Sequence, residues 1–410
     1  MANLFFAHSG GVTCVVNAIA SSVIKYARLN TSIDKVYVGK NGILGAINGD
    51  LYDSNSLTDQ SLARLTQTPA SAFGSCRYKL SHPDDSFVDY EKLIATFKQY
   101  NIRYFLYNGG NDSQDTTNKI QQACRARGYE IQCIGIPKTI DNDLAMTDCC
   151  PGYGSTAKYV AISTLEASLD IASMCATSTK AFILEVMGRH TGWIAAAASL
   201  IKHDPSDPPH IILIPERAFE QERFIKQVKH SIDQNGYCVI VAAEGIKNAQ
   251  GSFISSQNST DSFGHAQLGG VAQYLSSLLT TDLGIKTHYA IADYLQRSAA
   301  HIMSKTDLDQ AIALGKAAID ACSSNASGVM MSIKRISDLP YQWNIEHVPL
   351  DKVANIERKL PKSFIDADGS INNAFKAYAS PLIQGEAYPS YHNGLPIYFD
   401  LKNIEQVVDG

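Results

Sequence analysis

Short apolar runs rich in β-branched and aromatic residues alternate with helical patterns along most of this 410-residue chain. The first three expected strands are NLFFAH at 3–8, KVYVG at 35–39 and RYFLYN at 103–108. Because parallel strands need crossover connections, and helices usually make them, this alternation predicts an α/β fold with parallel sheets covered by helices on both faces. Ligands bind to such sheets at the carboxyl ends of strands, near the point where the strand order reverses.

The same alternation continues to about residue 304 and then changes. Further strands are expected at IQCIGIP (131–137), KAFILEVMG (180–188), HIILIPE (210–216), YCVIVAAEG (237–245) and HYAIADYLQR (288–297). After residue 326, SGVMMSIKRI and YQWNIEHVPL indicate two strands joined by a turn. We therefore predict a first α/β domain from 1–151, completed by about 305–325, a second from 152–304, and a C-terminal extension from 326–410 that packs on the domains.

Four strand ends carry glycine or polar residues where a helix is expected to begin. They are SGG (9–11), GGNDS (109–113), PKTIDND (137–143) and MGRHTG (187–192). Unpaired backbone N–H groups and the helix dipole make such turns candidate anion sites, although one of them alone is more often just a tight turn. Four in one chain favour a polyphosphate or sugar-phosphate ligand. The chain contains no GxxxxGK[ST] loop, and no GxGxxG follows the first strand, which argues against Walker-type nucleotide binding and against an NAD enzyme.

PKTIDND is the most informative of these turns. Phosphoryl transfer between oxygens needs a base for the attacking hydroxyl and positive charge on the transferred group. Asp141 is a candidate base, Asp143 a second carboxylate that orients it, Thr139 a hydrogen-bonding hydroxyl and Lys138 the positive charge. A surface turn in which Asp and Asn bond their own backbone fits the same residues, so the spacing alone leaves both interpretations open.

Charge and cysteine content exclude several classes of protein. The net charge is −5, with 35 basic and 40 acidic side chains, which argues against a nucleic-acid partner. The nine cysteines are odd in number and irregular in spacing, and they indicate free thiols in a reducing cytoplasm. The N-terminus MANLFFAHSGG lacks the basic region of a signal peptide, and the apolar segment WIAAAASLI is too short to span a membrane.

Seven motifs occur in the order that is found in phosphofructokinases. They are SGG, GSCRY, GGNDS, PKTIDND, EVMGRHTG, AAEG and YLQR. The chain resembles the pyrophosphate-dependent branch of that family over most of residues 3–310, with looser similarity through LIQGE at 383–387. The resemblance implies two Rossmann-like α/β domains that face a cleft, which agrees with the alternation of strands and helices.

The resemblance also implies roles for residues of the first half. Gly11 and Gly110 would offer backbone to the phosphoryl donor, and Arg77 of GSCRY would reach its phosphates. Asp141 would deprotonate the 1-hydroxyl of fructose 6-phosphate, with Thr139 beside it. For Arg77, an ordinary solvated loop arginine is the plain alternative.

For the second half the resemblance implies a sugar-phosphate pocket. Its residues would be Ile140, Met187, Gly188, Arg189, Glu244, Tyr294, Leu295, Gln296 and Arg297. Glu244 would accept hydrogen bonds from sugar hydroxyls, and the stretch from Tyr294 to Arg297 would hold the 6-phosphate. The plain alternatives are a helix-capping carboxylate for Glu244 and a salt bridge for Arg297.

Two positions bear on the choice of donor. ATP-dependent members of the family carry glycine where this chain has Asp112 and Lys138, and the pyrophosphate branch carries Asp and Lys, as here. The Asp112 carboxylate would take the space and the charge of the ATP α-phosphate. The resemblance therefore implies that this turn excludes the longer donor.

Two of the predicted site residues depart from the family pattern. The residue before Asp112 is usually a Mg²⁺-binding aspartate, and here it is Asn111, an acceptor without charge. Lys180 stands where ATP-dependent members place an arginine that crosses a subunit interface to the sugar phosphate, so a point charge replaces a bidentate fork. Mg²⁺ remains the expected cofactor, because a metal bridged to pyrophosphate needs few protein ligands.

The expected activity is a cytoplasmic, pyrophosphate-dependent phosphorylation of fructose 6-phosphate by a homodimer or homotetramer with no nucleic-acid or membrane partner. Two alternatives remain. An ATP-dependent phosphofructokinase is disfavoured by Asp112 and Lys138. A non-catalytic, sugar-phosphate-binding regulatory subunit is disfavoured by Thr139, Asp141 and Arg189, while Asn111 keeps that alternative open.

Overall fold

The computed structural model describes residues 1–260 and 266–406. The chain forms two compact units, each built from separate segments. The first contains Met1–Gly152, Ala300–Glu357 and Gly385–Gly410, and the second contains Tyr153–Ala299 and Arg358–Gln384. The predicted C-terminal extension is thus divided, with residues 358–384 in the second unit and the remainder of 326–410 in the first.

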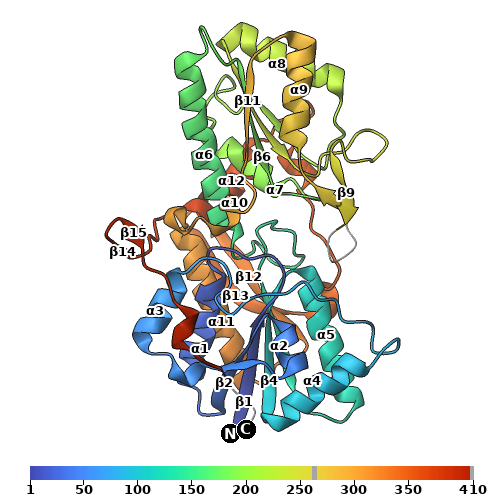
Figure 1. The fold of residues 1–410 in the computed structure, drawn as a ribbon, viewed down its shortest axis with the longest axis vertical. Helices are drawn as coiled ribbons and strands as arrows, with labels where there is room; N and C mark the ends of the chain where they lie inside the picture. The colour runs from blue at the N-terminus through green and yellow to red at the C-terminus, as the bar shows by residue number, and fades with distance from the viewer. Residues whose placement is uncertain (261–265, 407–410) are drawn as a thin grey trace. The chain divides into compact units, whose positions relative to one another are not determined.

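The first unit is built on an eight-stranded sheet (Figure 1). Its strand order is β13-β12-β5-β4-β1-β2-β3-β16. The strands are β1 (Ala2–His8), β2 (Ile33–Gly39), β3 (Leu51–Asp53), β4 (Ile102–Gly109), β5 (Gln132–Pro137), β12 (Val329–Asp338), β13 (Tyr341–Pro349) and β16 (Glu405–Gln406). The five strands from β12 to β2 pair in parallel, whereas β13, β3 and β16 pair antiparallel to their neighbours.

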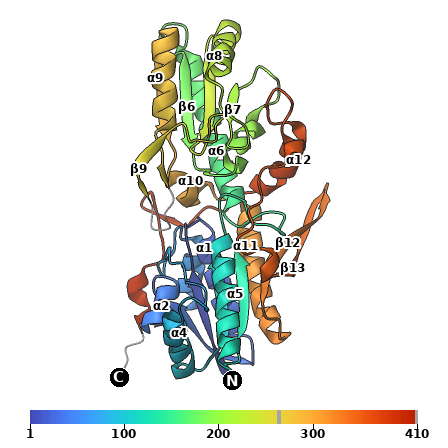
Figure 2. The same cartoon turned by 90° about the vertical axis from the view of Figure 1, so that its right-hand side faces the viewer.

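Helices cover both faces of this sheet, as the alternation predicted (Figure 1). The helices are α1 (Val16–Ala27), α2 (Ile43–Asn48), α3 (Asp59–Gln67), α4 (Val88–Gln99), α5 (Asn111–Ala126) and α11 (Lys305–Ser323). Leu4, Phe5, Phe6 and Ala7 are consecutive in β1 and all fully buried, because side chains on both faces of this strand meet helices. Figure 2 shows the hairpin of β12 and β13, which the sequence predicted, extending outward from the sheet.

The strand order of the first unit reverses at β1. This strand pairs in parallel with β2 on one side and with β4 on the other, although β2 follows it in the chain and β4 comes later. The carboxyl ends of β1 and β4 therefore form a topological switch point, where open α/β sheets bind ligands. The turns SGG and GGNDS follow these two ends.

The second unit is built on a four-stranded parallel sheet in the order β11-β6-β8-β7. Its strands are β6 (Ala181–Val186), β7 (Ile211–Leu213), β8 (Cys238–Ala243) and β11 (Thr287–Ile291). Its helices are α6 (Tyr153–Met174), α7 (Trp193–Ala197), α8 (Gln221–Asn235), α9 (Val271–Leu283), α10 (Leu295–Ser298) and α12 (Asn373–Ala379). Two further antiparallel pairs are formed by β9 (Ser256–Thr260) with β10 (Ala266–Leu268) and, in the first unit, by β14 (Tyr391–His392) with β15 (Leu395–Pro396).

The C-terminal segment of the second unit packs on the buried Trp193. The indole ring lies 5.3 Å from the Tyr378 ring and 6.0 Å from the Phe364 ring, measured between centroids. Its Nε1 donates a hydrogen bond to the backbone carbonyl of Arg358 at 3.1 Å. The segment 358–384 therefore contributes side chains to the core of this unit.

Several expected strands are shorter in the structure, and the one expected at 288–297 also changes to a helix at its end. The predicted strand at 288–297 ends at Ile291, and Leu295–Ser298 forms the helix α10. The chain turns at Asp293, which has a φ of 34°. The Gln296 side chain then donates to the Asp293 carbonyl at 3.0 Å and accepts from the backbone N–H of Met187 at 3.2 Å. These contacts stabilise a helical turn that the apolar pattern of the segment does not indicate.

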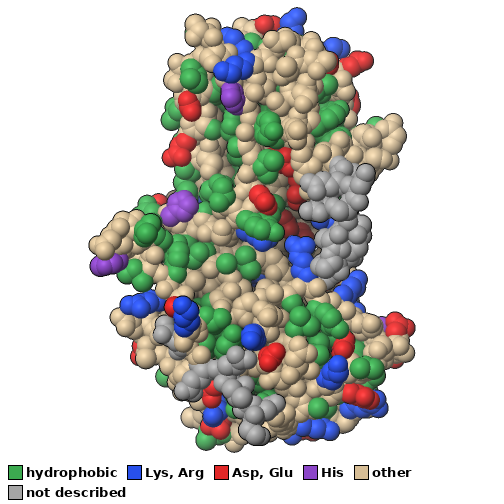
Figure 3. Space-filling model, viewed as in Figure 1, with side chains coloured by type: hydrophobic (Ala, Val, Ile, Leu, Met, Phe, Trp, Pro, Cys, Tyr) green, Lys and Arg blue, Asp and Glu red, His purple; other side chains and the backbone are tan. Residues whose placement is uncertain are grey.

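Charged side chains of both signs are interspersed on the face of the molecule drawn in Figure 3. Within the described residues, no helix is long and apolar enough to cross a membrane.

Candidate functional site

Three predicted turns of the first unit lie side by side. His8 pairs with Asn108 at the ends of β1 and β4, and Gly109 pairs with Pro137 at the ends of β4 and β5. The turns that follow these strands therefore leave the sheet at one edge. The structure thus brings together SGG, GGNDS and PKTIDND, which are far apart in the sequence.

Lys138 connects the first and the third of these turns. Its side chain is 3% exposed, and its ammonium group donates to the carbonyl oxygen of Ser9 at 2.7 Å and to that of Gly11. The backbone N–H of Lys138 donates to the Gly109 carbonyl at 3.1 Å. The lysine predicted to supply charge to the donor therefore also holds the turn after β1 in place.

The loop that carries Arg77 lies along the same turn. The Gly10 N–H donates to the Cys76 carbonyl at 2.9 Å, and the Ser75 hydroxyl donates to the Gly10 carbonyl at 2.8 Å. Arg77 is exposed and follows directly. The backbone just before Arg77 therefore lies next to the glycine turn, and the role of Arg77 toward the donor stays a prediction.

The turn after β4 leads directly into the 16-residue helix α5. A Cβ on Gly109 would lie 2.0 Å from the Ser113 hydroxyl oxygen, so only glycine fits this close approach of strand and helix. Gly110 caps the helix, and Asp112 is exposed in its first turn. The Asn111 side-chain oxygen accepts from the Asp112 N–H at 2.7 Å. A helix N-terminus at the carboxyl edge of a parallel sheet favours an anion.

The PKTIDND loop is held by its own polar side chains. The Asp141 N–H donates to the Thr139 hydroxyl at 3.1 Å. Asn142 is fully buried, has a φ of 54°, and accepts from the Cys150 N–H at 3.0 Å. Asp141 and Asp143 are half-buried on either side of Asn142, and the buried Ile140 anchors the loop. The loop thus contains the predicted catalytic carboxylate together with a turn in which the Thr139 hydroxyl accepts from the backbone two residues on.

His8 and Asn108 are polar residues of this edge that the sequence analysis did not single out. His8 Nδ1 and Asn108 Oδ1 are 3.2 Å apart, and Asn108 Nδ2 donates to the Ile136 carbonyl at 3.2 Å. The pKa of His8 is lowered to about 3, mainly by burial and in smaller part by the positive charge of Lys138, while the hydrogen bond to Asn108 opposes the shift. A neutral imidazole therefore links the ends of β1 and β4. The sequence feature that could have indicated this pair is a single polar residue at the end of each of the two apolar strands.

The predicted sugar-phosphate residues of the second unit gather at the carboxyl ends of β6 and β8. Gly188 has a φ of 136°, and its carbonyl accepts from the Gly245 N–H at 3.2 Å. A Cβ on Gly245 would lie 2.0 Å from the Arg189 carbonyl oxygen, so the turns after β6 and β8 are in direct contact. Met187 and Arg189 are half-buried in this turn.

Glu244 lies in the turn after β8. Burial raises the pKa of its carboxyl group, while a hydrogen bond from the Gly188 backbone and the charge of Arg189 act in the opposite direction. Asp293 contributes a further negative charge. The contact of Glu244 with sugar hydroxyls stays a prediction.

The YLQR stretch divides into exposed and buried parts. Tyr294 and Leu295 are 62% and 64% exposed, and the Arg297 guanidinium lies 4.0 Å from the centre of the Tyr294 ring. Gln296 is buried, and its side chain bonds the backbone of Met187. Gln296 therefore positions the Met187 turn, and Arg297 is the charged group of the stretch.

Lys180 lies apart from these residues within one chain. It precedes β6, whereas Met187, Gly188 and Arg189 follow the same strand. Its ammonium group donates to the Cys175 carbonyl at 2.5 Å. The structure does not bring Lys180 to the other predicted sugar-phosphate residues of its own second unit.

Glu216 is a further residue of this region that the sequence did not indicate. Its Oε1 accepts from the N–H of Gly192 at 3.0 Å and from that of Leu360 at 2.9 Å. Gly192 ends the MGRHTG turn, and Leu360 belongs to the C-terminal segment. Burial raises the pKa of Glu216, whereas these two N–H groups lower it. Glu216 thus holds the MGRHTG turn against residues that are distant in sequence.

Comparison with known proteins identifies relatives over almost the whole chain. Residues 3–322 match the phosphofructokinase family. The chain is 52% identical over 405 residues to a pyrophosphate–fructose 6-phosphate 1-phosphotransferase of Xanthomonas campestris, covering 98% of this chain and 96% of the relative. An enzyme with the same name from Halomonas elongata is 52% identical over 396 residues, covering 96% and 94%.

A solved structure shares the complete fold. The crystal structure of the pyrophosphate-dependent phosphofructokinase from Marinobacter aquaeolei matches with a TM-score of 0.91 and 47% identity, covering 100% of this chain and 98% of that one. The resemblance predicted from the seven motifs is confirmed. The chain belongs to the phosphofructokinase family.

Proposed function

We propose that the protein transfers a phosphoryl group from pyrophosphate to the 1-hydroxyl of fructose 6-phosphate, giving fructose 1,6-bisphosphate and phosphate. The reaction is reversible and belongs to glycolysis and gluconeogenesis. One observation carries this proposal: Asp112 stands at the N-terminus of α5, beside the turn that holds Lys138 and Asp141. Two relatives at 52% identity carry the name of this activity.

The first unit provides the donor site. Gly11, Gly110 and the N-terminus of α5 present backbone N–H groups to pyrophosphate, and Arg77 extends to its outer phosphate. Lys138 holds the turn after β1 in place and adds positive charge where negative charge develops on the transferred phosphoryl group. Asp112 stands at the end of the site and excludes the α-phosphate of ATP.

Asp141 acts as the general base. Its carboxylate takes the proton of the 1-hydroxyl as O1 forms a bond to the nearer phosphorus, and the bond from that phosphorus to the bridging oxygen breaks. The bridging oxygen leaves with the second phosphate. Thr139 fixes the loop, because its hydroxyl accepts the Asp141 N–H at 3.1 Å, and Asp143 contributes a second carboxylate.

The second unit provides the sugar-phosphate site. Met187, Gly188 and Arg189 line it, Glu244 accepts hydrogen bonds from sugar hydroxyls, and Arg297 holds the 6-phosphate with the backbone of α10. Gln296 contributes by holding the Met187 turn. Ile140 is the remaining residue of the predicted set.

Magnesium is the proposed cofactor. The described residues contain no group of three or more His, Cys, Asp or Glu side chains arranged to hold a metal ion. Mg²⁺ commonly keeps water and substrate phosphates as ligands, so a single amide oxygen at this edge, that of Asn111, would suffice as its protein partner. When bound, the ion neutralises charge on pyrophosphate.

A homodimer or homotetramer is proposed for the assembly. Tyr289 and Ile291 on β11 and Leu169 on α6 are 43%, 47% and 65% exposed, which is typical of a surface that contacts another subunit. Lys180 would then approach the sugar phosphate of a second copy. A cytoplasmic location, with no nucleic-acid partner, is proposed because all nine cysteines are free and the net charge is −5.

The test is a comparison of donors with the purified full-length chain, fructose 6-phosphate and Mg²⁺. Pyrophosphate should support turnover at a kcat/KM far above that for ATP, whereas the reverse ratio identifies an ATP-dependent enzyme. Asp141→Asn keeps the size of the side chain and should lower kcat by ~10²–10⁴-fold, as loss of a general base does. Wild-type protein that binds fructose 6-phosphate but turns over neither donor is a regulatory subunit and refutes the proposal.

A further inference from the structure

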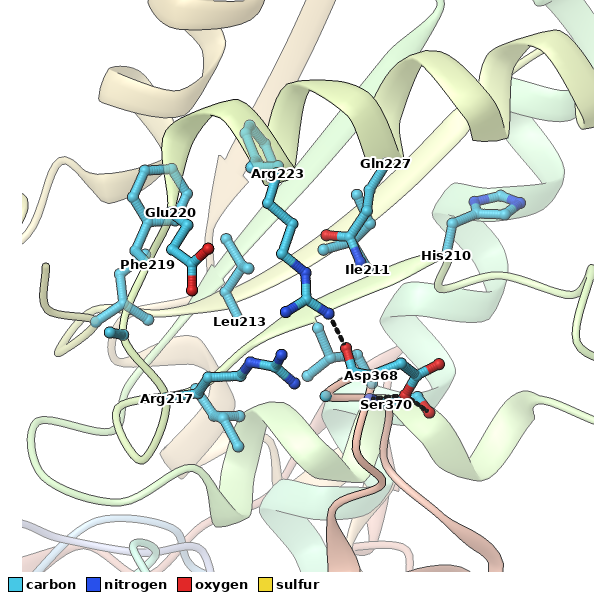
Figure 4. A pocket seen from close by; sticks show the side chains of 16 residues that line it. His210, Ile211, Leu213, Arg217, Phe219, Glu220, Arg223, Gln227, Asp368 and Ser370 are labelled. Carbon is cyan, nitrogen blue, oxygen red and sulfur yellow. Dashed lines mark hydrogen bonds between the residues drawn. The ribbon is translucent and has the colours of Figure 1, made fainter. Parts of the chain in front are cut away.

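A hollow of about 140 Å³ in the second unit is lined by none of the predicted site residues, although Ile246 in its lining lies two positions from Glu244. One wall is the edge of β7 that does not pair with β8, and another is the first part of α8. The turn at Asp368–Ser370 closes it from the C-terminal segment. We call it the arginine hollow, because Arg217 and Arg223 both line it (Figure 4).

The two arginines come from different elements and converge. Arg217 follows β7, Arg223 lies in the first turn of α8, and Figure 4 shows both guanidinium groups pointing toward the Asp368–Ser370 turn. Arg223 donates to the backbone carbonyl of Asp368. A Cβ on Gly369, whose φ is 88°, would lie 1.8 Å from Arg217 Nη1, so this guanidinium packs directly on the turn.

Asp368 and Glu220 also line the hollow, but within the described chain neither Arg217 nor Arg223 forms an ion pair with a carboxylate. Arg217 makes no side-chain hydrogen bond or ion pair with any residue of the described parts of the chain. The Asp368 carboxylate instead accepts from the Ser370 N–H at 2.9 Å and from the Ser370 hydroxyl at 2.7 Å. The Ser370 bonds lower the pKa of Asp368, and the charges of Arg217 and Arg223 lower it as well. Two half-buried guanidinium groups that cannot lose a proton favour an anion between them.

The other lining residues narrow the class of ligand. Two forks from different directions match the three oxygens of a phosphate better than the two of a carboxylate. The Glu220 carboxylate stands at the exposed start of α8 and forms no ion pair with either arginine within the described chain. The Glu220 carboxylate therefore disfavours a ligand with a second anionic group, and it can accept a hydrogen bond from a hydroxyl of the ligand. Ile211 and Leu213 provide an apolar wall for a short carbon chain.

We propose that the arginine hollow binds a small hydroxylated phosphomonoester as a ligand distinct from the reacting substrates. The consequence for activity rests on the function proposed above. Arg217 directly follows Glu216, whose carboxylate holds the Gly192 N–H of the MGRHTG turn and the Leu360 N–H of the C-terminal segment. A ligand that fixes Arg217 therefore changes the KM for fructose 6-phosphate and leaves the KM for pyrophosphate unchanged.

The probe is sn-glycerol 3-phosphate, titrated calorimetrically into the full-length protein with glycerol as the uncharged control compound. Arg217→Gln and Arg223→Gln should each weaken its binding at least about tenfold, the loss expected for one charge-assisted hydrogen bond. Arg217→Lys should retain part of the affinity. Lys226→Gln is the matched control, because it removes the same charge from an exposed position of α8 outside the hollow and should leave binding unchanged.

Saturating fructose 6-phosphate separates the two proposals. Binding that persists in its presence and depends on Arg217 and Arg223 supports the hollow, whatever the enzyme assay shows. Binding that fructose 6-phosphate abolishes, or that both glutamine variants retain, places the probe elsewhere and overturns the proposal. If wild type binds no probe and the glutamine variants only lower Tm, the two arginines only hold the Asp368–Ser370 turn in place, and the proposal is overturned. Binding without any change in KM for fructose 6-phosphate refutes the regulatory role.

Discussion

Replacement of Asp112 tests why this protein would use the shorter donor. Asp112 is exposed in the first turn of α5, at the edge where β1, β4 and β5 end. Asp112→Asn removes the charge and keeps the volume, whereas Asp112→Gly removes both. The Asn111 side chain accepts a backbone N–H from residue 112, a bond that survives in either variant. The turn should therefore keep its shape.

The expected size of the effect follows from the exposure of Asp112. Two unit charges about 4 Å apart repel by about 1 kcal/mol in water and about 4 kcal/mol at an effective dielectric constant of 20. A carboxylate that faces solvent in the free enzyme and an α-phosphate in the complex lies between these limits. Asp112→Asn should thus lower the KM for ATP by roughly 5-fold to nearly 10³-fold. Asp112→Gly should lower it further by making room.

The assay measures kcat/KM for ATP and for pyrophosphate in wild type and in both variants. The matched control is Asp59→Asn, which removes a carboxylate from the first turn of α3, away from the three turns. Pyrophosphate turnover should fall in both Asp112 variants, because the donor turn was built around the carboxylate. If neither variant changes the ratio of the two kcat/KM values relative to wild type, exclusion by charge is refuted, and the choice of donor lies elsewhere.

Three further results are expected. Lys138→Met should abolish most pyrophosphate turnover and lower Tm, because it removes the hydrogen bonds to the Ser9 and Gly11 carbonyls, whereas Lys138→Arg should keep more of the stability. Equal activity of wild type and Lys138→Met would contradict this prediction. Glu216→Ala should raise the KM for fructose 6-phosphate but not that for pyrophosphate, whereas Glu216→Gln, which keeps a hydrogen-bond acceptor, should leave both KM values unchanged. Equal effects of the two variants would refute a positioning role. The pKa of His8 is lowered to about 3 in the folded state, so the unfolded chain alone takes up this proton as pH falls from about 6.5. Urea unfolding at pH 7.5 and 5.5 should show about 1.4 kcal/mol more loss of stability in wild type than in His8→Gln, and equal losses would show that His8 is protonated in the fold.

The local sequence pattern was sufficient to predict most strands and helices and the position of the donor turns. Apolar runs that end in SGG and GGNDS predicted strands whose carboxyl ends carry ligand-binding turns, and the reversal of strand order at β1 places both at one edge. The strand expected at 288–297 was too long, because its helical end depends on the contact of Gln296 with Met187. A contact between residues 109 positions apart leaves no mark in the local pattern.

The same limit applies to side chains that act by holding others. The sequence indicated Lys138 as a charge, but its bonds to the carbonyls of the turn after β1 follow only from the pairing of β1, β4 and β5. Glu216 follows a strand with no distinguishing spacing, and its two backbone partners lie 24 and 144 residues away. The roles assigned to Arg77, Glu244 and Arg297 remain predictions that the proposed assays address.

The division of the C-terminal region has a consequence for how the protein unfolds. The chain passes from one unit to the other after Gly152, Ala299, Glu357 and Gln384, so neither unit is a continuous piece of polypeptide. Cleavage or truncation near residue 326 would remove β12 and β13 from one sheet and, in the same step, the Arg358 carbonyl that accepts the Trp193 indole N–H of the other unit. Neither unit can therefore be expressed alone as one continuous fragment, and truncation of the C-terminal region removes contacts from both units at once. Such interleaving favours unfolding in a single cooperative transition over the sequential loss of independent domains.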